Sequence, residues 1–328
     1  MAINLRSPYY QGTIVATTAY ATLGISIWDG SVTSPVTAQY NLRKSVIGSS
    51  PEVFFEISEL VRDYLDVTFD GNYNGQAVWV QTVSTAYDSS DTVLFTSTGT
   101  LLALDGYSYF EEPQAATPST LISNRELFVL EDNTFRIPIY EANNPTVIFY
   151  KDGKVIATQN PTGGSNSSVQ VKYVSIYGDD TNYDTFKERV TEANATYEDN
   201  SCIQSFLNSY SIGAVDKITV SDSNGIETIK VNVIEECKYE PKKITFINKF
   251  GVLQDMYFFK KAVEQMTIEK ESYKANTLSV YGQYSKSNHV NRDFNVIGKE
   301  SISLSSGFLS EEYNEVFKQM MLSEKVWV

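Results

Sequence analysis

Apolar and polar residues alternate in short runs along the first hundred positions of the chain. In the clearest run, residues 22–28, the side chains of Leu23, Ile25 and Ile27 share one face of a pleated strand. Asp-Gly pairs lie between such runs and indicate turns. The same signals predict further strands at residues 39–45, 52–57, 77–86 and 92–98. Strands at this spacing are typical of a β-sandwich.

One short helix is predicted inside this strand-rich region, at residues 58–65. Ser58 is of a residue type that caps helix N-termini, and Glu59 falls in the first turn. Val61 and Leu65 are four positions apart and therefore share a helix face. We expect this helix to cross an edge of the sandwich.

The middle of the chain carries two hairpin patterns. Residues 147–157 place Asp152-Gly153 between two apolar runs, and such a pair readily adopts the positive φ angles of a two-residue turn. Residues 217–233 repeat the pattern around Asn224-Gly225. A helix is predicted between the hairpins, at residues 184–194. This region is therefore expected to be antiparallel β with one helical insertion.

The C-terminal part mixes strands with a final helix. Strands are predicted at residues 244–247 and 256–259, and a helix capped by Ser310 at residues 310–325. The last three residues, 326–328, are apolar, which predicts a final strand paired either within the chain or with a neighbour. The apolar face of the helix is expected to comprise Phe317, Met320 and Met321.

These patterns together predict the fold class. We expect a mainly β protein built from successive antiparallel β-sandwich modules, Ig-like or fibronectin-like, with a few short helices and a C-terminal α+β region. A stretch with two prolines and small polar residues indicates a linker near residue 115. The expected parts are an N-terminal β-sandwich domain at 1–112, a linker at 113–120, a second β-rich domain at 121–237 and a C-terminal assembly region at 238–328.

Charge is distributed unevenly along the 328 residues, whose net charge is −14. Residues 238–328 hold 13 of the 26 basic and 11 of the 40 acidic residues, so residues 1–237 hold 13 basic and 29 acidic residues and carry −16. An acidic chain is a poor ligand for phosphates, which argues against direct nucleic-acid binding. The nearly neutral C-terminal part suits contact with another protein surface, including an acidic copy of the same chain.

Targeting signals are not apparent in the sequence. The N-terminus shows no apolar signal core, and no run of about 18 apolar residues occurs. We therefore expect neither an export signal nor membrane insertion. The two cysteines, Cys202 and Cys237, are compatible with one disulfide or with two free thiols, and their small number favours reduced thiols made in a cytosol.

Residues suited to catalysis or metal binding are sparse. The single histidine, His289, has no cysteine or carboxylate motif beside it. Residues 70–75 match the opening of a calcium loop, but Gln81 stands where the bidentate carboxylate belongs, so a Gly/Asn-rich turn is the better interpretation. Motifs for nucleophilic catalysis, phosphate loops and zinc helices are missing. We predict no catalytic, cofactor or metal residues, and no enzyme activity.

Two alternatives stay open at this point. Carboxylate pairs at 111–112, 131–132 and 235–236 leave room for a glycosidase, which needs no histidine. Tyrosines and asparagines in strand and turn positions are compatible with a carbohydrate-binding or adhesive β surface, although the same residues form an ordinary solvent face.

Several segments resemble virion structural proteins of tailed phages, particularly phages of Bacteroidetes-like marine bacteria. They are residues 3–8, 54–65, 247–260, 293–295, 298–301 and 311–315, together with Tyr273. The resemblance implies a subunit of a tail, baseplate or neck ring, made in the host cytoplasm and resident in the virion. Its implied partners are identical subunits and other virion proteins. The interface is expected among Phe250, Tyr257, Phe258, Phe259, Phe317, Met320, Met321 and Trp327.

Overall fold

The computed structural model describes most of the chain. The described residues are 2–30, 37–48, 52–74, 76–109, 117–130, 135–161, 170–175, 215–234, 236, 238–276, 281–283, 287 and 289–328. They are mainly β, with 53% in strands and 7% in helices. They form two compact units: unit 1 comprises Met1–Glu235, Lys243–Tyr257 and Leu309–Val328, and unit 2 comprises Glu236–Lys242 and Phe258–Phe308. The predicted region 238–328 is thus shared between the units.

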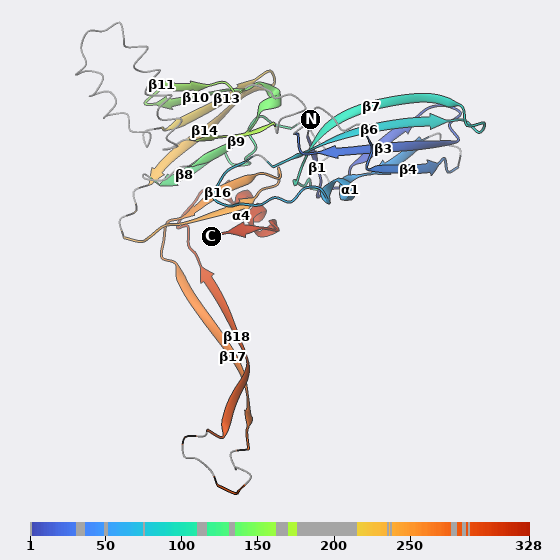
Figure 1. The fold of residues 1–328 in the computed structure, drawn as a ribbon. Helices are drawn as coiled ribbons and strands as arrows, with labels where there is room; N and C mark the ends of the chain where they lie inside the picture. The colour runs from blue at the N-terminus through green and yellow to red at the C-terminus, as the bar shows by residue number, and fades with distance from the viewer. Residues whose placement is uncertain are drawn as a thin grey trace. The chain divides into compact units, whose positions relative to one another are not determined.

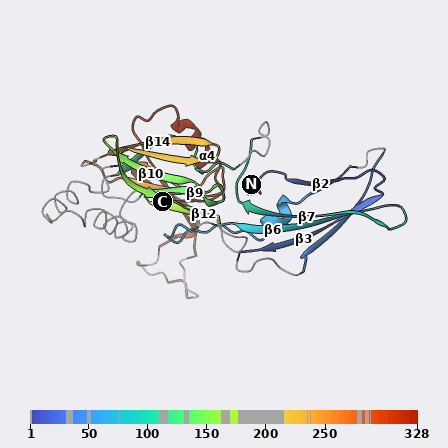
Figure 2. The same cartoon turned by 90° about the horizontal axis from the view of Figure 1, so that it is seen from above.

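A five-stranded sheet in the order β1-β7-β6-β3-β4 builds the first part of unit 1. Strands β3, β6 and β7 run side by side in both views (Figures 1 and 2). A smaller sheet of β2 and β5 and the helix α1 share a buried apolar cluster with it. The elements are β1 (Ala2–Asn4), β2 (Tyr10–Ile14), β3 (Tyr20–Trp28), β4 (Tyr40–Ser45), β5 (Glu52–Glu56), α1 (Ser58–Arg62), β6 (Val78–Tyr87) and β7 (Val93–Leu104).

The alternating pattern predicted four strands of this sheet and β5 of the smaller sheet, and it missed β1 and β2. All five predicted strands are confirmed, and Leu23, Ile25 and Ile27 are buried as expected. The predicted capping role of Ser58 was wrong, because Ile57 occupies the N-cap position and makes no side-chain capping bond. The carboxylate of Glu56 instead accepts a hydrogen bond from Ser58 N at 2.9 Å.

A second five-stranded sheet, in the order β11-β10-β13-β14-β8, follows in unit 1, next to a two-stranded pair of β12 and β9. Most pairs are antiparallel, whereas β1 with β7 and β14 with β8 are parallel. The strands are β8 (Glu126–Leu130), β9 (Arg136–Tyr140), β10 (Thr146–Lys151), β11 (Lys154–Gln159), β12 (Val171–Ser175), β13 (Lys217–Asp222) and β14 (Gly225–Ile234), and a 3-10 turn, η1, covers Glu141–Asn143.

Both predicted hairpins are present. Asp152 and Gly153 have φ of 48° and 75°, as a two-residue turn between β10 and β11 requires. In the second hairpin the turn lies one residue earlier than expected, because Asp222 pairs with Gly225. The Asp222 carboxylate fixes this register by accepting hydrogen bonds from Asn224 N at 2.7 Å and Gly225 N at 3.1 Å.

A third sheet, in the order β16-β15-β19, brings the end of the chain back into unit 1. It consists of β15 (Lys242–Ile247), β16 (Leu253–Phe258) and β19 (Val326–Trp327). The prediction of a final strand is confirmed, and the strand pairs within the chain, with Thr245 opposite Trp327 and Phe246 opposite Val326.

The last helix, α4 (Tyr313–Leu322), is shorter than predicted and buries a different face. Its N-cap is Glu312, without a side-chain bond, and Ser310 contributes only its backbone carbonyl, which accepts from Tyr313 N. The buried residues are Tyr313, Val316 and Gln319, whereas Met321 is 81% exposed. The predicted apolar face was wrong because Gln319 is drawn inward by its hydrogen bond to Ser123 Oγ at 2.7 Å.

Other predicted features can also be placed. The predicted helix at 184–194 and both cysteines lie outside the described residues. At the end of the predicted linker, Ser119 and Thr120 are buried, and Thr117 Oγ1 accepts a hydrogen bond from Ala2 N at 2.8 Å. No helix in the described part of the chain is long and apolar enough to cross a membrane.

Two glycines allow the loop between β15 and β16 to lie directly on the backbone that follows β7. Gly251 has φ of 76°, and a Cβ there would lie 2.4 Å from the backbone nitrogen of Gly106. Tyr107 N donates a hydrogen bond to Lys249 O at 2.8 Å at the same contact. No side chain fits at position 251 without separating these two backbones.

We expect Gly251→Ala to lower the free energy of unfolding by at least about 3 kcal/mol, because it adds backbone strain and a clash with main-chain atoms. Gly153→Ala is the matched control: its φ is 75°, but a Cβ there has nothing within 4 Å. The control is expected to cost about 1 kcal/mol. Urea denaturation of both variants measures the difference, and equal losses would contradict the close backbone contact.

Candidate interaction surface

The β-hairpin of unit 2 is the most exposed element among the described residues. Strands β17 (Val263–Lys274) and β18 (Asn291–Ser303) pair antiparallel along their whole length, and every residue in both is exposed. They run side by side as a two-stranded ribbon (Figure 1). We call this hairpin the arm. A ribbon with both faces in water lacks the burial that normally stabilises strands.

The register of the arm assigns its side chains to two faces. Between Val263 and Lys270 the strands pair without a shift, so residues alternate strictly from one face to the other. A β-bulge follows, where Asn295 has a φ of 52° and is left without an opposite residue. The Met266 face consists of Glu264, Met266, Ile268 and Lys270 of β17 and Val296, Gly298, Glu300 and Ile302 of β18. The Thr267 face consists of Val263, Gln265, Thr267 and Glu269 with Ile297, Lys299, Ser301 and Ser303.

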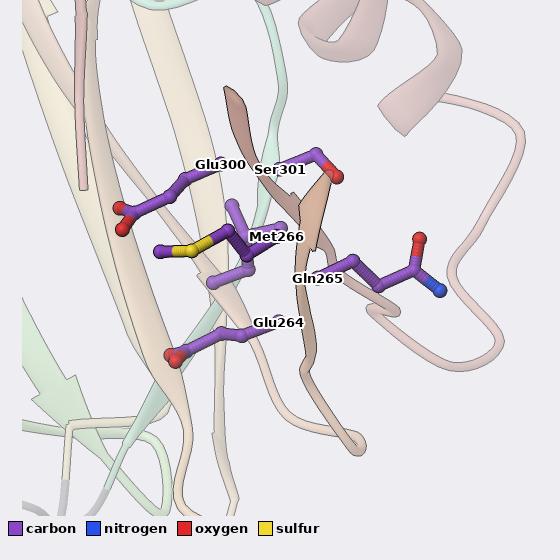
Figure 3. A pocket seen from close by; sticks show the side chains of 6 residues that line it. Glu264, Gln265, Met266, Glu300 and Ser301 are labelled. Carbon is purple, nitrogen blue, oxygen red and sulfur yellow. The ribbon is translucent and has the colours of Figure 1, made fainter. Parts of the chain in front are cut away.

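The close view of the arm confirms this alternation. Glu264, Met266 and Glu300 project to one side of the ribbon, and Gln265 and Ser301 project to the other (Figure 3). These residues, with Ile302, line a shallow open depression. Because the lining side chains point in opposite directions, they shape a surface rather than a chamber around a small ligand.

The Met266 face is rich in exposed apolar side chains. Met266 is 60% exposed, Ile268 53%, Val296 56% and Ile302 37%. The Thr267 face is mostly polar along the same length, where Gln265, Thr267, Lys299, Ser301 and Ser303 lie. A contiguous apolar strip between charged residues is typical of a protein contact surface.

The charged residues of the Met266 face are acidic near one end of the arm and basic near the other. Glu264 and Glu300 lie on the side near the base of the arm, and Lys270 lies on the side near its tip. Lys270 also contacts Asp293, with Nζ 3.3 Å from Oδ2, in a pair that is about half exposed on both sides. Exposed pairs of this kind contribute little to stability, so Lys270 stays available to a second partner.

The base of the arm is closed by backbone and ionic contacts within unit 2. Lys260 N donates to Ser305 O at 3.0 Å, next to the first strand pair. The ammonium of Lys260 lies 3.0 Å from a carboxylate oxygen of Glu236, and this hydrogen bond, with that from Lys238 N, lowers the pKa of Glu236. Glu236 therefore stays ionised in mildly acidic solution.

The predicted interface residues occupy other places. Tyr257, Phe258 and Phe259 are buried in the chain itself, and Met321 is the most exposed of the eight. Phe250, Phe317, Met320 and Trp327 are half-buried. Trp327, for example, packs against Phe69 with ring centroids 5.6 Å apart. A partner contact at these positions stays a prediction, and the arm offers far more apolar surface.

The sequence contained a signal for the arm that the prediction did not use. Residues 263–274 alternate, but charged residues fall on both alternating faces: Glu264 and Lys270 on one, Glu269 and Glu271 on the other. A strand packed on a core keeps one face free of charge. Charges on both faces therefore indicate a ribbon with neither face packed on a core.

Unit 1 holds a separate cluster of buried titratable groups. Asp255 is buried, and its Oδ1 accepts hydrogen bonds from Tyr73 Oη at 2.5 Å and Thr245 Oγ1 at 2.7 Å. Lys243 Nζ donates to Tyr73 Oη at 2.9 Å, and the Arg136 guanidinium lies 4.3 Å from the Tyr73 ring centre. Loss of solvation raises the pKa of Asp255, and Lys243 opposes this shift.

Burial also raises the pKa of Tyr73, with the nearby Asp255 charge adding to the effect. The cluster joins the loop after α1 to β15 and β16 through the hydrogen bonds of Tyr73, Thr245 and Asp255 Oδ1, and to β9 through Arg136 over the Tyr73 ring. Oδ2 of Asp255 has no hydrogen-bond partner among the described residues. These contacts hold the four segments together, and the raised pKa of Asp255 makes their contribution to stability depend on pH.

We expect Asp255→Asn to flatten the pH dependence of stability. Because the folded-state pKa is raised above the ordinary value of 3.8, the contribution of Asp255 is fully present below pH 3.8 and is lost as pH rises through the folded pKa. The stability of Asp255→Asn relative to the natural chain should therefore increase from acidic to neutral pH. Thermal or urea denaturation across this range measures it.

Asp255→Ala is the companion variant, because it removes the acceptor that Tyr73 and Thr245 share. It should be less stable than Asp255→Asn by about 2–3 kcal/mol at every pH. Parallel pH profiles for the natural chain and Asp255→Asn would contradict the raised pKa.

The residues weighed for chemistry show no assembled centre among those described. His289 is exposed in a loop of the arm. In the calcium-like segment, Asp70 Oδ1 accepts a hydrogen bond from Asn72 N at 3.0 Å, and Gln81 lies in β6. Of the carboxylate pairs only Glu236 is described. The described residues contain no group of three or more His, Cys, Asp or Glu that could hold a metal ion.

Comparison with protein families and with curated protein sequences finds no match to this chain. The resemblance of the segments quoted above to phage virion proteins therefore stands on those residues alone.

Proposed function

We propose that this chain is a structural subunit of a tailed-phage virion and forms part of a tail, baseplate or neck ring through protein-protein contacts. Its work is assembly rather than catalysis. Its sheets serve as Ig-like or fibronectin-like modules, and its partners are identical subunits and other virion proteins. The observation that carries this proposal is the arm, whose residues are exposed on both faces.

An exposed two-stranded ribbon is only marginally stable by itself in water, since three or more strands or a packed face are normally needed. Apolar side chains along the Met266 face add to the cost of leaving the arm in solvent. A binding partner removes both costs. Assembly therefore accounts for the exposed ribbon of the arm. Enzymes and sugar-binding domains instead bind their ligands in concave pockets, which the ribbon does not form.

The composition of the particle tests the proposal. Mass spectrometry of purified virions that encode this chain should detect it in several copies per particle, at a constant ratio to the major tail and capsid proteins. Non-structural proteins of the same phage serve as the control for carry-over from the lysate. Absence of the chain from washed, intact particles would overturn the proposal.

A further inference from the structure

Among the described surfaces, the arm exposes the longest strands and a strip of apolar side chains that a partner could cover. It combines a two-stranded ribbon, two open edges and a strip of apolar side chains that lie from 37% to 60% exposed. Each strand of about 12 residues spans roughly 40 Å, so one face of the ribbon offers on the order of 400 Å². A contact between two such faces buries on the order of 800 Å² in total, which lies below the standard size of specific interfaces and in the range of weak, transient contacts.

The open edges of the arm are poor candidates for that contact. Nine of the 25 residues in β17 and β18 are charged, and they occur on both faces. Frequent charges along exposed strands are a means by which proteins prevent edge-to-edge pairing. The Met266 face, which carries Met266, Ile268, Val296 and Ile302, is therefore the better candidate for the contact surface.

The order of residues on the Met266 face makes it complementary to itself. A two-fold axis that lies in the contact plane and crosses β17 at Thr267 reverses the strand direction and places β17 on β17 and β18 on β18. Glu264 of one copy then faces Lys270 of the other, and Met266 faces Ile268. On the second strand Ile302 faces Val296, and Glu300 faces Gly298.

Three of these four pairings are chemically favourable, and the fourth is sterically possible. Glu264 with Lys270 is an ion pair, and the two apolar pairings bury side chains that are now exposed. Gly298 provides room for the long Glu300 side chain, because nothing lies within 4 Å of the position that a Cβ would occupy there. The parallel alternative has its two-fold axis along the strands and places β17 on β18, so each residue faces its own cross-strand neighbour. Glu264 then faces Ile302, Met266 faces Glu300 and Lys270 faces Val296, which leaves every charge opposite an apolar side chain.

Charge over the whole chain also favours a second copy as the partner. Residues 258–308 hold 7 of the 26 basic and 5 of the 40 acidic residues and carry +2, which leaves 19 basic and 35 acidic residues, or −16, on the rest of the chain. Two arms, each with a small net charge, therefore approach each other with less repulsion than the acidic remainders of two copies do.

We infer that the Met266 faces of two arms pack against each other in an antiparallel, two-fold contact that joins two copies of this chain. The inference rests on the proposed function for the identity of the partner and adds the surface, the orientation and the residue pairs. Because the contact is closed by its symmetry, it joins copies in pairs. The small area gives weak association by itself, with a dissociation constant in the micromolar range, on the order of 1–100 μM.

A charge exchange tests the pairing of Glu264 with Lys270. Sedimentation equilibrium of the full chain should show dimers that weaken about tenfold or more in Glu264→Lys and in Lys270→Glu, since each single change creates two repulsive pairs per dimer. The double variant Glu264→Lys/Lys270→Glu restores both attractive pairs and should dimerise within about threefold of the natural chain. If the arm binds a different surface, the double variant should show no such recovery of dimerisation.

The apolar part of the contact has its own matched variants. Ile268→Asp should abolish the dimer, whereas Thr267→Asp, one residue away on the opposite face, should leave it unchanged. Circular dichroism of each variant checks that the fold is kept. A double charge variant no tighter than the single ones, or a natural chain that stays monomeric at high concentration, would overturn the arm contact.

The two proposals fail separately. If particles contain the chain but the charge exchange gives no recovery, only the two-fold contact is wrong. If the charge exchange restores the dimer but particles lack the chain, the contact stands and the virion assignment is wrong.

Discussion

One buried amide, that of Asn248, links stretches of unit 1 that are far apart in the sequence. Its Nδ2 donates to Leu121 O at 2.7 Å and to Gln254 Oε1 at 2.9 Å, while its Oδ1 accepts from Phe250 N at 2.9 Å. The side chain is fully buried. Loss of any partner would leave a polar group unpaired away from water, so the loop between β15 and β16 has one favourable arrangement.

That arrangement continues outward through neighbouring amides. Gln254 Nε2 donates to Asn124 Oδ1 at 3.3 Å, and Gln319 of α4 accepts a hydrogen bond from Lys249 N at 3.3 Å. The segment before the arm and the segment after it thus meet in one polar network inside unit 1. Strand β19 follows α4 in the chain, so it can pair with β15 only when the segment after the arm lies in unit 1.

Much of this architecture could be predicted from the sequence, because local patterns encode it. Alternation located β3 to β7, and Asp152-Gly153 specified its turn. Buried polar networks have no such local signature: Gln319 looks like a surface residue until Ser123 and Lys249 are placed beside it. The exposed apolar face of the arm escaped prediction for a related reason, since an apolar strand residue such as Ile268 is expected to face a core.

The arm is inserted in the sequence between two segments of unit 1, β16 and α4. Its length can therefore change without altering the strands and helices of unit 1. Two residues added to each strand of such a hairpin extend it by about 7 Å and leave every existing side chain on its own face. One residue added to a single strand moves the residues beyond it to the opposite face. The reach of the arm can therefore change during evolution in even steps, whereas odd steps need a compensating bulge such as the one at Asn295.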